Sequence, residues 1–246
     1  MCLAATQSDL AGLQHQLAVG RVEGRSYPLA RHLLIGALAV GLLASGFALA
    51  RLVDRELDPR SPETGNSGVQ KEIRQWDRYN SRGHRIGSSA PRLVLLEFGD
   101  FECPACAVFQ REVVQPLLRD YPGEVALVYR HWPLPYHRYA YTLAVASECA
   151  ELAGAFGGFH QAVFDRQDSI GVLSLADWAQ RSGITTVRSF LECAAGGSQN
   201  NRVEADIEAV RELGGVATPT VFINGRYIPN ATESASTIQY VSELLR

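Results

Sequence analysis

The chain has 246 residues, of which 46% are hydrophobic and 20% are charged, and its formal net charge is −3 at pH 7. This length allows one domain with appendages, and the apolar content is sufficient for a hydrophobic core. The weakly negative charge, with lysine and arginine scattered along the chain, excludes a nucleic-acid-binding surface.

An apolar segment at residues 32–50 is the first distinct element, and it contains no Asp, Glu, Lys or Arg. As a helix, this segment spans roughly 28 Å, close to the hydrocarbon thickness of a bilayer. A buried core helix is disfavoured because the segment is apolar on all sides. We therefore expect a single-pass transmembrane anchor at 32–50, preceded by a cytoplasmic tail at 1–31.

Cleavage and orientation of this segment stay open. Residues 48–50, Ala-Leu-Ala, fit a signal-peptidase site, and cleavage after Ala50 would leave a secreted or periplasmic protein. The leader of about thirty residues is long for a signal peptide, which favours an uncleaved signal or anchor. Arginines are balanced on the two sides, so an extracytoplasmic position of the large domain rests on the chemistry inferred below.

Residues 51–82 are expected to form a linker with a short helix. Prolines and glycines interrupt the polar stretch from residue 54 to residue 68, as is typical of linkers. Ile73, Trp76 and Tyr79 then fall near one helical face, together with Val69. This spacing indicates a short helix on the domain or membrane surface, or ordinary core packing.

The motif CPAC at residues 103–106 follows an apolar run and opens a helix-like segment. A thiol at a helix N-terminus faces unpaired backbone N–H groups and the positive end of the helix dipole, and both stabilise the thiolate. Two acidic neighbours, Asp100 and Glu102, oppose this effect. The spacing therefore predicts a redox-active dithiol at Cys103 and Cys106.

The alternative for this motif is half of a zinc site, since Cys-x2-Cys also binds zinc. The remaining cysteines, Cys2, Cys149 and Cys193, are single, without a second close Cys/His pair. We therefore expect no metal at this site, and the sequence offers no cofactor motif. His131 and His137 are expected in packing or surface roles, and neither is assigned to catalysis.

Beyond a loop or edge hairpin at 83–91, the pattern predicts alternating strands and helices. The expected elements are a strand at 92–98, a helix at 103–119, a strand at 124–130, a helical region at 138–213, strands at 219–223 and 226–229, and a helix at 232–245. Asn224-Gly225 between two apolar runs is a strong hairpin signal. This order indicates an α/β fold with a small mixed sheet covered by helices on both faces.

Three motifs in this order resemble the DsbA-like branch of the thioredoxin superfamily. They are EFGDFECPAC at residues 97–106, RHWPL at 130–134 leading into the helical region, and Thr218-Pro219-Thr220 before the Asn-Gly hairpin. The resemblance covers about residues 83–246. It implies a thioredoxin-like fold with an inserted helical subdomain at about 138–213.

The resemblance also implies roles for individual residues. Cys103 matches the exposed attacking cysteine, and Cys106 matches the buried resolving one. Glu97 stands where the superfamily places a buried acid, whose raised pKa suits it to shuttle the proton of Cys106. Pro219 matches a cis-proline facing the dithiol, which would expose the backbone of Thr218 for pairing with an extended substrate.

One departure from the best-known oxidases of this branch concerns Ala105, where they carry a histidine that stabilises the thiolate. Its absence makes the dithiol less oxidising, and a threonine before the proline also occurs in isomerases and reductases of the superfamily. The direction of electron flow therefore stays open, while the exchange chemistry does not depend on it.

Cys149 and Cys193 both fall in the helical insertion, in the contexts SECA and LECA. In an exported domain we expect them to form a structural disulfide, as in some members of the family, and the alternative is two buried thiols. Cys2 precedes the apolar segment and is expected to stay reduced in the cytoplasm.

The sequence therefore predicts a thiol-disulfide oxidoreductase of the cell envelope, most simply an oxidase. Its expected partners are exported proteins with cysteine thiols or disulfides, a membrane redox protein that recycles the dithiol, and the membrane itself through residues 32–50. The alternatives are an envelope reductase or isomerase, and a non-catalytic peptide-binding module of the same fold.

Overall fold

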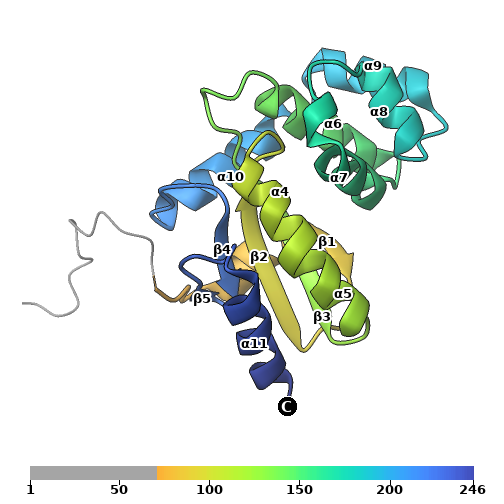
Figure 1. Cartoon of the computed structure of the whole chain (residues 1–246). Coiled ribbons are helices and arrows are strands. Elements are labelled where there is room, and N and C mark those ends of the chain that lie inside the picture. The colour runs from red at the N-terminus through yellow and green to blue at the C-terminus, as the bar shows by residue number, and fades with distance from the viewer. Residues whose placement is uncertain (1–70) are drawn as a thin grey trace, which may run out of the picture. The chain divides into compact units, whose positions relative to one another are not determined.

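In the computed structural model, residues 71–246 are described, so the predicted anchor at 32–50 and most of the linker lie outside the described residues. The described part contains a five-stranded sheet in the order β1-β3-β2-β4-β5 (Figure 1). The strands are β1 (His84–Gly87), β2 (Leu93–Gly99), β3 (Val125–His131), β4 (Thr220–Ile223) and β5 (Arg226–Tyr227). Only β2 and β3 pair in parallel, and the other neighbours are antiparallel.

Strand β2 lies at the centre of the sheet, and both of its faces are buried. Because side chains alternate along a strand, Leu93 and Leu95 pack in one core while Val94, Leu96 and Phe98 pack in another. The first core includes residues of the helical segment after β2 and of α11 (Ser234–Leu245), and the second includes residues of α3 (Trp76–Asn80) and α10 (Asn200–Glu212). The predicted mixed sheet with helices on both faces is therefore confirmed.

The helix after β2 is continuous but changes its winding. It comprises α4 (Pro104–Phe109), the π-helical turn η1 (Gln110–Val114) and α5 (Gln115–Asp120). Pro116 lacks an N–H group and its ring displaces the carbonyl four residues earlier, so a wider turn before it accommodates the proline. π-helical turns of this kind are frequent at functional sites.

The inserted helices α6 to α9 group together beyond one end of the sheet, and α10 leads back to it (Figure 1). They are α6 (Ala140–Leu152), α7 (Phe156–Asp165), α8 (Leu175–Arg181) and α9 (Val187–Gly196), with a 3-10 turn η2 at Gln167–Ser169. Ser174 and Asp177 form a capping box at the start of α8. Gly197 ends α9 in the left-handed conformation, with φ of 61°.

Three smaller expectations can be compared with the structure. Residues 83–91 contain an edge strand, β1, which pairs with β3. The short helix α3 starts only at Trp76, and it contributes Tyr79 to the core rather than lying on the surface. In the hairpin, Asn224 and Gly225 have φ of 45° and 87°, the two positive values of a type I′ turn.

Between residues 71 and 246, none of the helices is both long enough and apolar enough to span a membrane.

Candidate functional site

Cys103 occupies the N-cap position of α4, so the helix begins at Pro104, one residue after the predicted start at Cys103. Its backbone is extended, with φ of −73° and ψ of 119°, and Pro104 takes the first helical position. Proline suits that position because its missing N–H would have no partner inside the helix. The carbonyl of Cys103 accepts the first helical hydrogen bond, from the N–H of Ala107 at 3.2 Å. Its side chain therefore lies at the end of the helix where N–H groups are unpaired.

Both thiols are buried, although to different extents. Cys106 has no exposed surface and Cys103 is 6% exposed, so the expectation of an exposed Cys103 is wrong. The Cys103 thiol donates a hydrogen bond to the backbone carbonyl of Thr218 at 3.4 Å. Thr218 and the cis-peptide bond to Pro219 cover this sulfur, and only a small part of it faces solvent.

The two sulfurs have pKa values shifted in opposite directions. The neighbouring thiol of Cys106 lowers the pKa of Cys103 most, and burial opposes this. The side chain of Thr218 and the backbone N–H groups of Cys106 and Ala105 lower the pKa further, to about 6. Burial raises the pKa of Cys106 well above its usual range, and the hydrogen bond to Cys103 and the charge of Glu97 add to that. At neutral pH the reduced pair therefore holds one thiolate, on Cys103.

Glu97 is fully buried on the face of β2 that carries Leu93 and Leu95. Its Oε2 accepts a hydrogen bond from the side-chain amide of Gln110, while its Oε1 has no hydrogen-bond partner within residues 71–246. Burial raises the pKa of Glu97 well above its usual range and the charge of Cys103 raises it further, although hydrogen bonds from Gln110 and Cys106 oppose them. The structure thus places Glu97 close enough to both thiols that the charge state of each group affects the pKa values of the others.

Gly99 makes room for this carboxylate. A Cβ atom at this position would lie 2.8 Å from Oε1 of Glu97 and 2.6 Å from Cε2 of Tyr129. Real Cβ atoms do not approach other atoms so closely, so a side chain at Gly99 would displace the acid or the tyrosine ring. The glycine is required here for a close approach and not for a turn.

The acidic neighbours of the motif serve the surrounding loops. Asp100 is buried, and its carboxylate accepts the N–H of Glu102 at 2.7 Å and that of Leu134 at 2.7 Å. It also lies 2.8 Å from Nδ1 of His137, while Glu102 accepts the N–H of Tyr139. These bonds fix the loop after β3 against the loop before α4.

Two glutamines complete the site, and the sequence reasoning missed both. Gln110 lies four residues after Cys106, a spacing that places both side chains on one helix face, so periodicity offered a signal for it. Gln167, from the helical insertion, donates to the carbonyls of Phe101 at 2.8 Å and Cys103 at 2.9 Å. No local pattern announces Gln167, because its contact joins segments more than sixty residues apart.

The other cysteine pair lies in the insertion. Cys149 of α6 and Cys193 of α9 form a disulfide with Cα atoms 5.9 Å apart. Cys2 lies outside the described residues.

The family model described as thioredoxin matches residues 79–243. Among curated proteins, a Na(+)/H(+) antiporter NhaA 3 of Salinispora tropica is 36% identical over 146 residues, which are 59% of this chain and 22% of the antiporter. A NhaA 1 of Mycolicibacterium vanbaalenii is 32% identical over 209 residues, 83% of this chain and 32% of that protein. The chain thus spans a third or less of the length of these relatives.

Among solved structures, oxidised BdbD from Bacillus subtilis aligns with a TM-score of 0.63 and 19% identity, covering 74% of this chain and 99% of BdbD. The thiol-disulfide exchange protein alpha-DsbA2 from Wolbachia pipientis gives 0.58 and 18%, over 69% and 91%. ScsC from Proteus mirabilis gives 0.56 and 21%, over 92% and 97%. The chain belongs to the thioredoxin family, and its described part has the fold of the DsbA-like members.

Proposed function

We propose that this chain is a thiol-disulfide oxidoreductase of the cell envelope that transfers the Cys103–Cys106 disulfide to exported proteins. The observation that carries the proposal is the opposite shift of two pKa values within one Cys-x2-Cys motif, to about 6 at Cys103 and well upward at Cys106. Such a pair has one sulfur that is a good leaving group and one that holds its proton.

Oxidation of a client proceeds in two exchanges. A client thiolate attacks Cys103 Sγ of the disulfide, the S–S bond breaks, and Cys106 leaves with the electron pair. A second client thiolate then attacks the client sulfur of the mixed disulfide, and Cys103 leaves as a thiolate. The client loses two electrons and gains a disulfide, while the protein gains them as its dithiol.

Glu97 serves the first exchange as the proton donor. Cys106 leaves as a thiolate in a buried place, where its raised pKa makes it a strong base. The raised pKa of Glu97 means that the carboxyl holds a proton to deliver. In the reverse exchange the same carboxylate takes the proton from Cys106. Gln110 fixes one oxygen of Glu97 and leaves Oε1 without another partner among the described residues.

The acidity of Cys103 supports the oxidase direction, but by a moderate amount. At pH 7, a pKa of about 6 in place of 9.0 stabilises the reduced form by about 1.4 kcal/mol, which raises the reduction potential by about 30 mV. A second candidate is a reductase or isomerase. One observation supports this second candidate: the Cys103 pKa of about 6 lies nearer to the value of about 7 for thioredoxin than to the value of about 3.5 for DsbA.

An extracytoplasmic location is part of the proposal. The disulfide between Cys149 and Cys193 is typical of proteins in oxidising compartments, and the apolar segment 32–50 supplies an anchor or an export signal. A protein that donates disulfides needs a partner to reoxidise it, and a membrane redox protein would be within reach of an anchored domain. A module that only binds peptides does not need one thiol with a lowered pKa beside another with a raised pKa.

The deciding experiment is the equilibrium reduction potential of Cys103–Cys106 in glutathione or dithiol buffers. A value near about −120 mV, as for DsbA, would support the oxidase, and a value near about −270 mV, as for thioredoxin, would replace it with the reductase. In cells, Cys106→Ser should trap mixed disulfides with clients, whereas the matched Cys103→Ser variant should trap none. If Cys106→Ser traps nothing, the exchange mechanism is wrong.

A further inference from the structure

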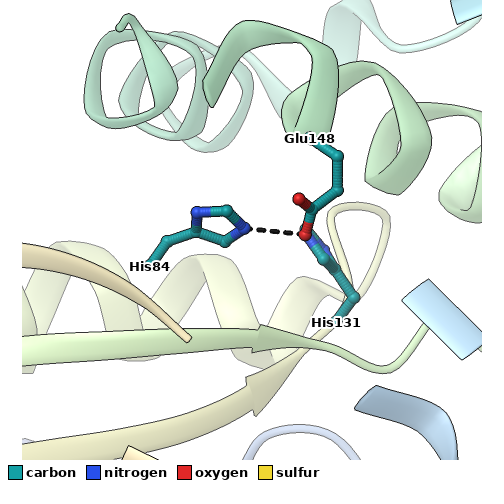
Figure 2. A group of neighbouring side chains, drawn as sticks. All are labelled: His84, His131 and Glu148. Atoms are coloured by element: carbon teal, nitrogen blue, oxygen red, sulfur yellow. Dashed lines mark hydrogen bonds and ion pairs between the residues drawn. The ribbon is translucent and has the colours of Figure 1, made fainter. Parts of the chain in front are cut away.

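A second cluster of ligand-type side chains lies in the described part of the chain, away from the dithiol motif in sequence. It consists of His84 from β1, His131 from the end of β3 and Glu148 from α6, which point toward one another (Figure 2). All three are buried, with exposed fractions of 5%, 1% and 2%. The Oε1 atom of Glu148 lies 2.7 Å from Nε2 of His84 and 3.3 Å from Nε2 of His131.

We propose that these three side chains bind one divalent transition-metal ion of the Zn²⁺ class. One nitrogen of each histidine and one oxygen of Glu148 lie within 4.8 Å of one another, so a small movement of the side chains places all three around one ion. Two imidazoles and a carboxylate are a donor set that zinc takes in proteins, with its fourth position left to another ligand. Calcium and magnesium prefer a set made of oxygens alone.

Residues around the cluster orient two of the ligands, as in established metal sites. The carboxylate of Glu151 lies 3.5 Å from Nδ1 of His84, which is the carboxylate–histidine arrangement that fixes the ring for metal binding through its other nitrogen. Arg202 pairs with Oε2 of Glu148 and so leaves Oε1 directed at the histidines. The hydroxyl of Ser147 lies 3.2 Å from Nε2 of His131 and donates to the carbonyl of Ala144.

The surroundings combine an apolar wall with a short route to solvent. Phe156 stacks on the ring of His84, with centroids 3.8 Å apart, and Phe101 lies at 6.0 Å from the ring of His131. On the outer side, the side chains of Glu151 and Arg202 are 51% and 52% exposed. The partners of His84 and Glu148 on this side are therefore half-exposed, although both ligand side chains are buried.

The position of the cluster gives the ion a structural role. His84 and His131 belong to two paired strands at the edge of the sheet, whereas Glu148 belongs to the first helix of the insertion. A bound ion would therefore tie the insertion to the sheet, next to the disulfide that holds the same helix to α9 through Cys149. This inference does not depend on the direction of disulfide exchange.

The test is zinc binding by the full-length chain, purified in detergent with the Cys103–Cys106 pair oxidised and Cys2 alkylated, so that no thiolate competes. After equilibration with Zn²⁺ and removal of free metal, elemental analysis counts zinc per chain. We expect His84→Gln to bind one zinc fewer than the wild type. His137→Gln is the matched control, because that histidine also faces a carboxylate, Asp100 at 2.8 Å, outside the cluster, and it should bind as much zinc as the wild type.

A stability readout on the wild type keeps the test independent of how well the variants fold. Zinc at a hundred times its dissociation constant should shift the folding equilibrium about 100-fold toward the folded state, and a chelator should reverse this. Glu148→Gln, which keeps the size of the side chain, should lose both the shift and the extra zinc. Equal zinc content in the wild type and His84→Gln, or a wild-type thermal unfolding curve that zinc does not move, would overturn the proposal.

Discussion

The two cysteine pairs of the described domain have the same chemistry and opposite surroundings. Cys103 and Cys106 are three residues apart at the start of a helix, with Glu97 and its partner Gln110 beside them. Cys149 and Cys193 are separated by 44 residues and join two helices of the insertion. The first pair has a helix terminus and a buried acid that move charge and protons, whereas the second closes a long loop. The surroundings of a cysteine pair therefore decide whether it exchanges disulfides or only crosslinks the fold.

The largest expected difference is in activity. Cys103→Ser should reduce disulfide exchange, measured by insulin reduction, to the level without enzyme, because the attacking sulfur is gone. The matched double variant Cys149→Ala/Cys193→Ala should retain exchange at temperatures where it is folded. Exchange by Cys103→Ser at the wild-type rate would show that the assignment of the two pairs is wrong.

The second difference is in stability. Removing the Cys149–Cys193 disulfide frees a loop of 44 residues in the unfolded chain and should cost about 4 kcal/mol in the free energy of unfolding. Urea unfolding of the double alanine variant measures this. The same measurement on Cys103→Ser, with the Cys149–Cys193 disulfide intact, is compared with the oxidised wild type. The loss in the free energy of unfolding should be smaller, because the Cys103–Cys106 disulfide closes a loop of only four residues. If losing the Cys149–Cys193 disulfide lowers the free energy of unfolding by no more than losing the Cys103–Cys106 disulfide does, the contrast between the two pairs is wrong.

The third prediction concerns Glu97, the buried acid beside the Cys103–Cys106 pair. Glu97→Gln should slow the exchange about 100-fold, because the buried Cys106 thiolate loses its proton donor. The matched control is Glu102→Gln, since this nearby carboxylate accepts a backbone hydrogen bond from Tyr139 and faces neither sulfur in our mechanism. Stopped-flow measurement of mixed-disulfide formation, starting from the oxidised protein and a client thiol, separates the two variants, and equal rates would remove Glu97 from the mechanism.

The smallest expected effect is the pH dependence of the reduced protein. The folded pKa of Cys103 is lowered to about 6 from 9.0, so the thiolate adds stability that is fully present above pH 9 and is lost as the pH falls through 6. At pH 7 this contribution is about 1.4 kcal/mol. Alkylation of Cys103 should rise with a midpoint near pH 6, and the stability difference between reduced wild type and Cys103→Ala should shrink between pH 9 and pH 6. A midpoint near pH 9 would contradict the lowered pKa.

The elements that rest on local pattern could be predicted from the sequence. The two strands on either side of the CPAC helix, the Asn224-Gly225 hairpin and the helical region at 138–213 all follow from hydrophobic period and turn chemistry, while the family resemblance implies that this region is an insertion. For the edge strand β1 the sequence predicts only a loop or edge hairpin, because four residues are too few to show an alternating pattern.

Contacts between distant segments could be predicted only where the family resemblance implies them, as for the Cys149–Cys193 disulfide and for Pro219 at the dithiol. Gln167 reaches the loop before α4, and the cluster of His84 with Glu148 joins residues 64 apart. Such contacts depend on how whole helices dock. The burial of Cys103 has the same origin in part, since its sulfur contacts the carbonyl of Thr218, 115 residues further along the chain.

Gly99 has a consequence for anyone who transplants this redox centre. The four residues CPAC are portable, but a methyl group at position 99 would collide with both the carboxylate of Glu97 and the ring of Tyr129, so the proton donor keeps its position only with a glycine there. A designer who moves the motif into another scaffold must therefore also include a glycine two residues after the acid and a tyrosine on the neighbouring strand. A transplanted motif without this glycine would keep both thiols but would exchange disulfides slowly.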